Sequence, residues 1–182
     1  MARLPYLDKD DLKDDDKELL ARNMNLHRIL AHSPGAARSF GALAKYIRFE
    51  STLDSRLREL TILQVGWLAK SPYEWVHHVE ISKNFGVTDD DIRALATETE
   101  GKDSGLPELD RLVLRVAREI TNNGAASLEA FDALKMQMSS EHVVDLMVTI
   151  TFYNAVVRFL ASVGIDVEDS YQHYLETYPL PE

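Results

Sequence analysis

The segment 73–78, with the sequence YEWVHH, contains the densest group of side chains able to do acid–base chemistry. Glu74 and His78 are four residues apart, so on a helix they lie on one face and can touch. A carboxylate beside a histidine fixes the tautomer of the ring and raises its basicity. Glu59 lies upstream among apolar residues, and a buried carboxylate needs a partner. We therefore predict that Glu59, Glu74 and His78 form a cluster that can relay a proton.

Each of these side chains also has a structural explanation. Ser71 and Glu74 have the spacing of a capping box, in which their side chains accept backbone N–H groups at the start of a helix. Glu59 is also consistent with a core carboxylate that pairs with a nearby arginine. His77 is expected to face another direction, as a structural or solvent-exposed residue. The candidate arginine partners of Glu59 are Arg56, Arg58 and Arg158.

A metal site is a second alternative for the same residues. Glu74 and His77 form one Glu-x-x-His, which is half of the motif of di-iron helical bundles, and the second copy is missing. Glu59, Glu74 and His78 could ligate a single divalent ion, but their spacing is not specific for one. Phosphate-binding glycine loops and Ser-His-Asp signatures are absent from the sequence. We therefore predict no metal and no cofactor.

Composition narrows the class of protein. The chain has 182 residues, 20 Lys plus Arg against 30 Asp plus Glu, a net charge of −10, and no cysteine. A thiol nucleophile, a disulfide and a thiolate zinc site are thereby excluded. Binding to nucleic acid or to an anionic membrane is disfavoured, because both need clustered Lys and Arg. The longest apolar stretch, 143–163, is interrupted by Asp145, Asn154 and Arg158, so no membrane span is predicted. No signal peptide is visible, and we expect a cytoplasmic protein.

The elements that must position these residues are helices. Strand signals are scarce, and start and stop residues divide the chain into helical segments, so we predict an all-α fold. The segments 57–68 and 143–163 are apolar on all sides, which is typical of helices at the centre of a bundle or at a subunit interface. The predicted helices cover roughly 15–31, 34–49, 55–69, 72–86, 89–99, 108–122, 128–138 and 140–163, with one or two turns after 166.

Two stretches of this sequence resemble a known family. They are 57–63 (LRELTIL) and 71–78 (SPYEWVHH), followed by Gly86. Together they resemble the carboxymuconolactone decarboxylase and alkylhydroperoxidase D (AhpD) superfamily. The resemblance is strong over about residues 40–95 and looser over the rest of the chain.

Redox members of that family carry a Glu and then Cys-x-x-Cys-x-x-x-His. On this sequence the Glu falls on Glu59 and the His on His78, while the two cysteine positions fall on Ser71 and Glu74. The chain is therefore similar to a cysteine-free branch of the family, with the sequence Tyr-Glu-Trp-x-x-His. Thiol redox is excluded there, because neither a hydroxyl nor a carboxylate can cycle through a disulfide.

The resemblance implies an AhpD-like helical bundle of about seven to nine helices in a single domain over 1–182. Residues 1–31 would be an N-terminal extension and 165–182 a C-terminal tail. The resemblance also implies a homo-oligomer that acts on a small organic molecule by decarboxylation or by conversion of a lactone or enol acid. Glu59, Glu74 and His78 would be catalytic, and Tyr73 and Ser71 would contact the substrate. The alternative is a non-catalytic oligomeric binding or scaffold protein whose Glu–His cluster is only structural.

Overall fold

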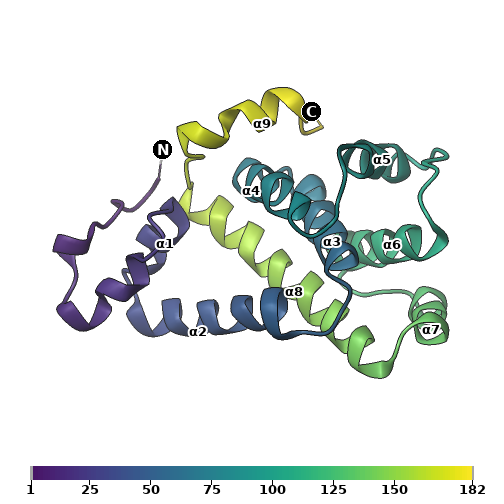
Figure 1. The fold of residues 1–182 in the computed structure, drawn as a ribbon, viewed down its shortest axis with the longest axis horizontal. Helices are drawn as coiled ribbons and strands as arrows, with labels where there is room; N and C mark the ends of the chain where they lie inside the picture. Colours follow the sequence, from purple (N-terminus) through teal and green to yellow (C-terminus); the bar gives the residue numbers. More distant parts are fainter. Residues whose placement is uncertain (1, 182) are drawn as a thin grey trace.

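The computed structural model describes residues 2–181, and all regular structure in that range is helical (Figure 1). The all-α prediction is confirmed. The helices are α1 (Asn25–Leu30), α2 (Pro34–Lys45), α3 (Ser55–Leu68), α4 (Pro72–Lys83), α5 (Asp89–Thr99), α6 (Glu108–Asn123), α7 (Leu128–Gln137), α8 (Ser140–Val163) and α9 (Gln172–Thr177). Shorter 3₁₀ or π segments are η1 (Lys9–Asp11), η2 (Asp14–Leu20), η3 (Tyr46–Glu50) and η4 (Asp169–Tyr171).

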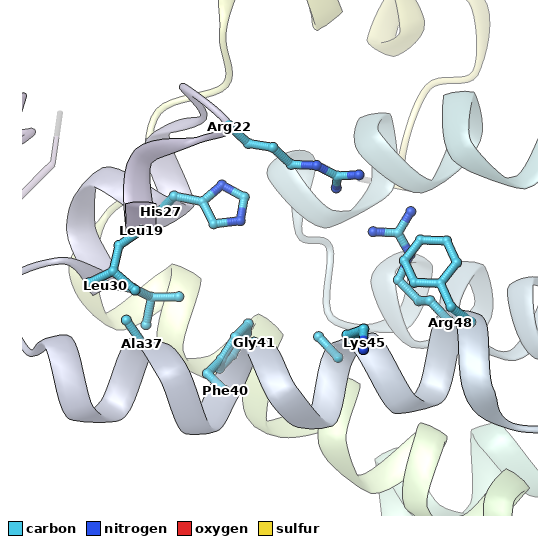
Figure 2. Close-up of a pocket in the computed structure, with 11 residues that line it drawn as sticks. Leu19, Arg22, His27, Leu30, Ala37, Phe40, Gly41, Lys45 and Arg48 are labelled. Carbon is cyan, nitrogen blue, oxygen red and sulfur yellow. The ribbon is translucent and has the colours of Figure 1, made fainter. Parts of the chain in front are cut away.

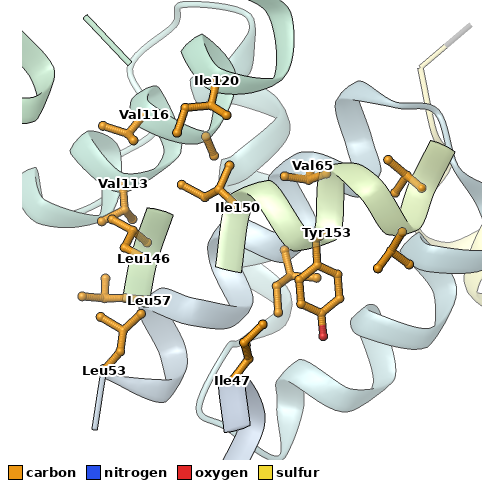
Figure 3. Close-up of a cluster of buried hydrophobic side chains, with 14 of the residues drawn as sticks. Ile47, Leu53, Leu57, Val65, Val113, Val116, Ile120, Leu146, Ile150 and Tyr153 are labelled. Carbon is orange, nitrogen blue, oxygen red and sulfur yellow. The ribbon is translucent and has the colours of Figure 1, made fainter. Parts of the chain in front are cut away.

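Helices α3 and α8 form the centre of the fold, as their all-round apolar sequences predict. Helix α3 packs against α4, α6 and α8, and ten consecutive residues of α3, Leu57–Gly66, are buried. In Figure 3, side chains from α3, α6 and α8 interlock in one apolar cluster that includes Val65, Val116 and Ile150. Polar side chains on α3 therefore lie in the protein interior, where they need partners.

Most helix boundaries follow the sequence signals. Asp54 caps α3 by accepting the N–H of Leu57, and Thr88 forms a capping box at the start of α5. The last predicted helix is capped by Ser139, one residue before the expected Ser140. Gly124 and Gly164 end α6 and α8 in the left-handed conformation that glycine adopts without strain.

The predicted helix over 15–31 is wrong. Residues Asp14–Leu20 form the 3₁₀ segment η2, the chain then bends, and α1 begins at Asn25. Contacts distant in sequence hold the segment instead, since Arg38 of α2 forms ion pairs with Asp16 and Glu18, both at 2.7 Å.

The two terminal segments pack beside the end of α8 and on α4. Arg3 donates its backbone N–H to the carbonyl of Val163, 2.7 Å away. The C-terminal residues turn back over α4 (Figure 1), where the indole N–H of Trp75 donates to the carbonyl of Tyr178 at 2.7 Å. The residues expected to form an N-terminal extension and a C-terminal tail therefore contact the helical bundle.

Helix α8 is, among residues 2–181, the one helix long and apolar enough to cross a membrane by length and composition. It packs against α3, α6 and α7 in this fold. Core helices of soluble proteins have the same length and composition, so this property alone is weak support for a membrane span.

Candidate active site

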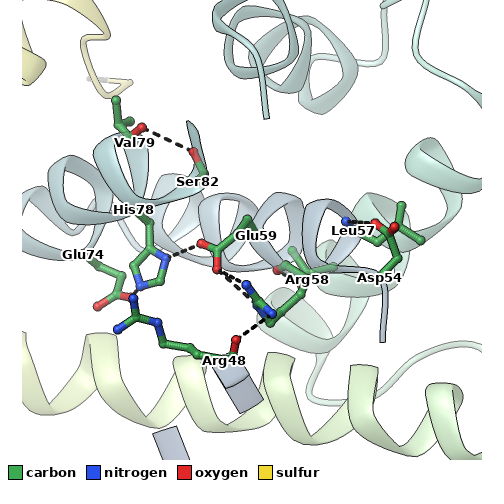
Figure 4. Close-up of polar contacts among 10 residues, drawn as sticks. Arg48, Asp54, Leu57, Arg58, Glu59, Glu74, His78, Val79 and Ser82 are labelled. Atoms are coloured by element: carbon green, nitrogen blue, oxygen red, sulfur yellow. Dashed lines mark hydrogen bonds and ion pairs between the residues drawn. The ribbon is translucent and has the colours of Figure 1, made fainter. Parts of the chain in front are cut away.

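The short connection between α3 and α4 brings the two halves of the predicted cluster together. Helix α3 ends at Leu68 and α4 begins at Pro72. Lys70 in this connection has a φ of 46°, in the left-handed region, which makes the chain reverse within a few residues. Figure 4 shows Glu59 on α3 pointing toward His78 on α4, with Glu74 on the other side of the ring. The four-residue spacing on α4 places Glu74 one turn before His78.

The Glu59–His78 contact predicted from the sequence is confirmed. Oε2 of Glu59 lies 2.8 Å from Nδ1 of His78, and the Glu59 side chain is fully buried. Nε and Nη2 of Arg58 donate to the other carboxylate oxygen at 3.1 and 2.9 Å. Of the three arginines considered as partners, Arg58 is the one that binds Glu59. Arg56 binds Asp91 and Asp110 instead, and Arg158 binds Asn154.

Glu74 is not engaged in a capping box. The Ser71 side chain makes no capping hydrogen bond, although the sequence has the right spacing. Oε1 of Glu74 lies 3.1 Å from Nε2 of His78, but off the line of the ring N–H, so the two form an ion pair without a hydrogen bond. The attraction between these buried charges competes with the capping geometry. His78 thus lies between two carboxylates, one at each ring nitrogen.

This arrangement keeps His78 protonated at neutral pH. Burial by itself would lower the pKa of His78, but the charges of Glu59 and Glu74 outweigh burial and raise the pKa to about 9. Burial would likewise raise the pKa of Glu59, and the neighbouring His78 and Arg58 hold it below its usual value. The cluster is therefore an imidazolium between two carboxylates, hydrogen-bonded to Glu59 through Nδ1 and ion-paired with Glu74 at Nε2.

Two neighbouring hollows lie on this side of the cluster, and His78 lines one of them. The inner cavity, of about 100 Å³, is lined by Glu74 and His78 of α4 together with Tyr153 of α8. The outer hollow, of about 230 Å³, lies between α1, α2 and η3 and is shown in Figure 2. Five residues line both, so the two hollows lie next to each other. The shared residues are Arg22, His27, Phe40, Ala44 and Arg48.

The other two predicted substrate contacts lie differently. Tyr73 lines the inner cavity, but its hydroxyl already accepts the N–H of Leu26 at 3.0 Å and donates to Glu168 at 3.1 Å. Ser71 does not reach this cavity and borders a separate hollow beside the end of α8. The structure therefore brings Tyr73 to the site through its ring and leaves Ser71 outside it.

His77 faces away from the cluster, as expected, and it is buried rather than solvent-exposed. Its Nδ1 lies 2.6 Å from the carbonyl of Tyr73, and its Nε2 lies 3.2 Å from Oε2 of Glu168. The ring of Tyr171 stacks on His77 with centroids 4.0 Å apart. His77 therefore fastens the C-terminal segment to α4.

Three site residues were missed by the sequence reasoning. Arg22, Arg48 and Tyr153 line the inner cavity. The Tyr153 ring meets His78 edge-on at 5.1 Å, and burial raises the pKa of its hydroxyl well above the usual value. The only sequence signal was the polar pair Tyr153-Asn154 inside an apolar helix, while Arg22 and Arg48 have no distinguishing neighbours.

No group of three or more His, Asp or Glu side chains in residues 2–181 has the geometry to hold a metal ion. Both ring nitrogens of His78 face carboxylates within 3.1 Å. The imidazolium that this favours has no lone pair for a metal. The arrangement suits proton transfer better than metal binding.

Comparison with known proteins agrees with this geometry. The family model described as "Carboxymuconolactone decarboxylase family" matches residues 34–101, which include α3, α4 and the cluster. A search of curated proteins found no match. The family resemblance seen in the sequence is thereby confirmed.

Several solved structures share the fold. An uncharacterized peroxidase-related protein with an AhpD core from Ralstonia eutropha JMP134 has a TM-score of 0.78 at 20% identity, covering 93% of this chain and 94% of that one. The debrominase Bmp8, in complex with 2,3,4-tribromopyrrole, has a TM-score of 0.78 at 18% identity, covering 98% and 100%. An uncharacterized peroxidase-related protein from Silicibacter sp. TM1040 has a TM-score of 0.67 at 17% identity, covering 93% and 92%. At these identities the similarity establishes an AhpD-like fold.

Proposed function

Because residues 34–101 match the model of the carboxymuconolactone decarboxylase family, we propose that this chain catalyses acid–base chemistry on a small organic molecule without thiol redox. The candidate reactions are decarboxylation and the conversion of a lactone or an enol acid. They share one step, the transfer of a proton to or from a carbon next to a carbonyl group. The observation that carries the proposal is the Glu59–His78–Glu74 chain, with contacts of 2.8 and 3.1 Å, ending at a cavity.

The geometry divides the roles among the three residues. Glu74 lines the cavity and is the base that takes a proton from the substrate carbon, whose C–H electron pair enters the enolate. His78, with a pKa of about 9, is the acid that returns a proton to the enolate. The proton on Glu74 then passes to the neutral imidazole and restores the starting state. Glu59 does not touch the substrate and acts as a positioning residue, since it holds the Nδ1–H of His78.

Decarboxylation uses the same groups. The C–CO₂ bond breaks, its electron pair forms an enolate, and His78 protonates the carbon as carbon dioxide leaves. A proton from water then restores the imidazolium. Tyr153 lines the cavity beside His78, and its hydroxyl would donate a hydrogen bond to the enolate oxygen. No step needs a cysteine, and the sequence has none.

A direct test is proton exchange in D₂O. Small lactones and 2-oxo acids are incubated with the protein, and deuterium at the carbon next to the carbonyl is followed by NMR. We expect exchange with at least one compound, a loss of 100-fold or more in Glu74→Gln on the scale typical of an acid–base group, and no change in Glu80→Gln. Glu80 is an exposed residue of the same helix and is the matched control. Exchange that is equally fast in Glu74→Gln would overturn the proposal.

The alternative, a binding or scaffold protein with a structural Glu–His cluster, is favoured by one observation. Both oxygens of Glu59 are occupied by protein donors, as in a purely structural ion pair. The deuterium-exchange experiment distinguishes this alternative from catalysis. A compound that binds in the cavity and shows no exchange under any condition would favour this alternative.

We also propose that the chain forms a homo-oligomer. Helix α2 has no buried residue, and exposed apolar side chains lie at Leu43, Phe49 and Val144. Apolar surface of this kind is normally covered by another protein surface. A second copy of the chain is the partner that the family resemblance implies.

A further inference from the structure

Arg48 is a cation without a counter-charge at the boundary of the two hollows. Its side chain is half-buried, and its Nε has no hydrogen-bond partner although it is shielded from solvent. No ion pair to Arg48 occurs among the described residues. A buried donor left unpaired costs free energy, so such a group is generally completed by a water or a ligand.

The backbone around Arg48 is fixed by several contacts. Arg48 lies in the π segment η3, whose two ends are tied to one carboxylate on α8, since the hydroxyls of Tyr46 and Ser51 both donate to Asp145. Nη1 of Arg58 donates to the carbonyl of Arg48 at 3.1 Å. Single π turns inside helices are frequent at functional sites. The arginine is therefore held in place by the fold rather than left free on the surface.

Arg22 supplies a second guanidinium to the same space. It comes from the bend between η2 and α1, outside the family-matched segment, and lines both hollows. Figure 2 shows Arg22 and Arg48 extending toward the same side of the outer hollow from two separate segments. Arg22 is exposed and forms no ion pair within residues 2–181, which is ordinary for a surface arginine. Its position beside Arg48, another arginine without an ion pair in that range, is unusual.

The charges around the hollows do not balance. The carboxylates of Glu59 and Glu74 are matched by His78 and Arg58. In the outer hollow Lys45 is paired with Glu50 at 2.7 Å, and no carboxylate lines that hollow. Arg22 and Arg48 therefore remain as two uncompensated positive charges, on a chain whose net charge is −10. A local positive charge on an acidic protein attracts a small anion rather than a polyanionic surface.

We propose that Arg22 and Arg48 form an anion-binding subsite for the carboxylate of the substrate. This inference rests on the proposed function, because it places the reacting carbon in the inner cavity beside Glu74 and His78. Guanidinium groups bind carboxylates through paired N–H···O bonds, which orient as well as attract. The rest of the outer hollow is apolar, with Leu30, Ala37 and Phe40 among its lining residues. The substrate is thus a small organic carboxylate with an apolar body.

The neutral imidazole of His27 is suited to the same subsite. Burial and then the charge of Arg22 lower the pKa of His27, which keeps it neutral beside the two arginines. Its Nδ1 is buried without a hydrogen-bond partner. A neutral ring can donate one hydrogen bond to a carboxylate without adding a third charge.

The test uses butanoate and benzoate as probes, with butanamide and benzamide as neutral analogues of the same shape, in isothermal titration calorimetry at low ionic strength. We expect a carboxylate to bind at least about tenfold more tightly than its amide, and Arg48→Gln to weaken carboxylate binding by about tenfold or more. Arg22→Gln should have a smaller effect in the same direction because Arg22 is exposed. Arg111→Gln, an exposed arginine of α6, should bind like the wild type.

Three results would overturn the subsite. They are equal affinities for carboxylate and amide, unchanged binding in Arg48→Gln, and no binding of either carboxylate at millimolar concentration. A fourth result would come from sedimentation of the Arg22→Gln/Arg48→Gln double variant. A lower mass than that of the wild type would mean that the two arginines bind an acidic group of a second copy of the chain. Carboxylate binding without deuterium exchange would retain the subsite and reject the proposed function, so the two failures are distinguishable.

Discussion

At the scale of single residues, the protonation of His78 determines what the cluster can do. A histidine with a pKa near its usual value would be a base at neutral pH, and the two flanking carboxylates instead make it an acid with a pKa of about 9. The same carboxylates make the imidazolium part of the stability of the core, because a buried charge pair is costly to break. The proposed catalysis and the stability of the core therefore depend on the same proton.

The pH dependence of stability is expected to report the charge on His78. The pKa rises from 6.5 in the unfolded chain to about 9 in the folded protein. The contribution of His78 to the free energy of unfolding is on the order of 3 kcal/mol. It is fully present below about pH 6.5 and is lost as the pH rises through 9. Urea unfolding of the wild type and His78→Gln between about pH 6 and pH 10 measures this. The difference in unfolding free energy should shrink toward high pH, and a constant difference would contradict the assignment.

Glu59→Gln is expected to destabilise the protein by about 3–5 kcal/mol, because it leaves the cations of Arg58 and His78 together in the core without a carboxylate. The exposed control Glu80→Gln should change stability by less than about 0.5 kcal/mol. In Glu59→Gln the pKa of His78, measured by NMR of the ring nitrogens, should fall. An unchanged His78 pKa would mean that Glu59 has no electrostatic role.

Peroxide chemistry is expected to be absent. The chain has no cysteine, and Ser71 and Glu74 occupy the positions that correspond to the redox cysteines of the family. Hydroperoxide consumption with dithiol reductants should not exceed that of a heat-inactivated control. Turnover above the control that disappears in His78→Ala would overturn this expectation.

At the scale of elements, the site depends on how α3, α4, α8 and η3 meet. The short α3–α4 connection sets the Glu59–His78 contact, and α8 contributes Tyr153 from the opposite side. In Figure 3 the Tyr153 hydroxyl points away from the apolar side chains of α6. The π segment η3 adds Arg48, and it is the element with the most specific anchor, since Asp145 binds both of its ends.

Asp145→Asn is expected to loosen η3. One hydroxyl loses its acceptor, because the amide keeps a single oxygen in place of two, and the cost is about 1–3 kcal/mol. Hydrogen exchange of the backbone amides of residues 46–51 should become faster, while that of α6 should not. Asp132→Asn, which removes an exposed ion pair with Lys135, is the control and should leave both rates unchanged. If the amides of residues 46–51 exchange at the same rate in the wild type and in Asp145→Asn, Asp145 does not anchor η3.

At the scale of the whole molecule, the terminal segments contribute to the proposed site. The bend before α1 supplies Arg22 and α1 supplies His27, while the C-terminal residues hold α4 through Glu168 and Tyr178. The proposed function therefore needs more of the chain than the family-matched segment. The exposed apolar residues of α2, η3 and α8 mark the face where a second copy would pack.

Sedimentation at micromolar concentration is expected to give a mass that is a multiple of 20.6 kDa. Phe49→Glu, which puts a charge on a side chain that is 59% exposed, should lower the mass without unfolding the protein. Leu128→Glu, on the exposed face of α7, is the matched control. A mass near 20.6 kDa for the wild type would exclude the homo-oligomer.

The sequence alone determined the helical class, most helix boundaries and the central acid–base cluster. These follow from local rules. Asp54 and Thr88 cap their helices through neighbours within three residues, and the spacing of Glu74 and His78 places them on one face of a helix. The Glu59–His78 contact was also predictable, because only a short turn separates two helices that must pack against each other.

Only the tertiary structure decided the remaining parts of the site. Ser71 and Glu74 have capping-box spacing, but the ion pair with His78 draws Glu74 away, and a distant Arg38 holds η2 where a helix was predicted. Arg22 and Arg48 are separated by 26 positions in sequence and carry no local motif. Their meeting at one cavity depends on the packing of η2, α1, α2 and η3. Local spacing cannot encode a contact between side chains whose separation is set by the fold of the whole chain.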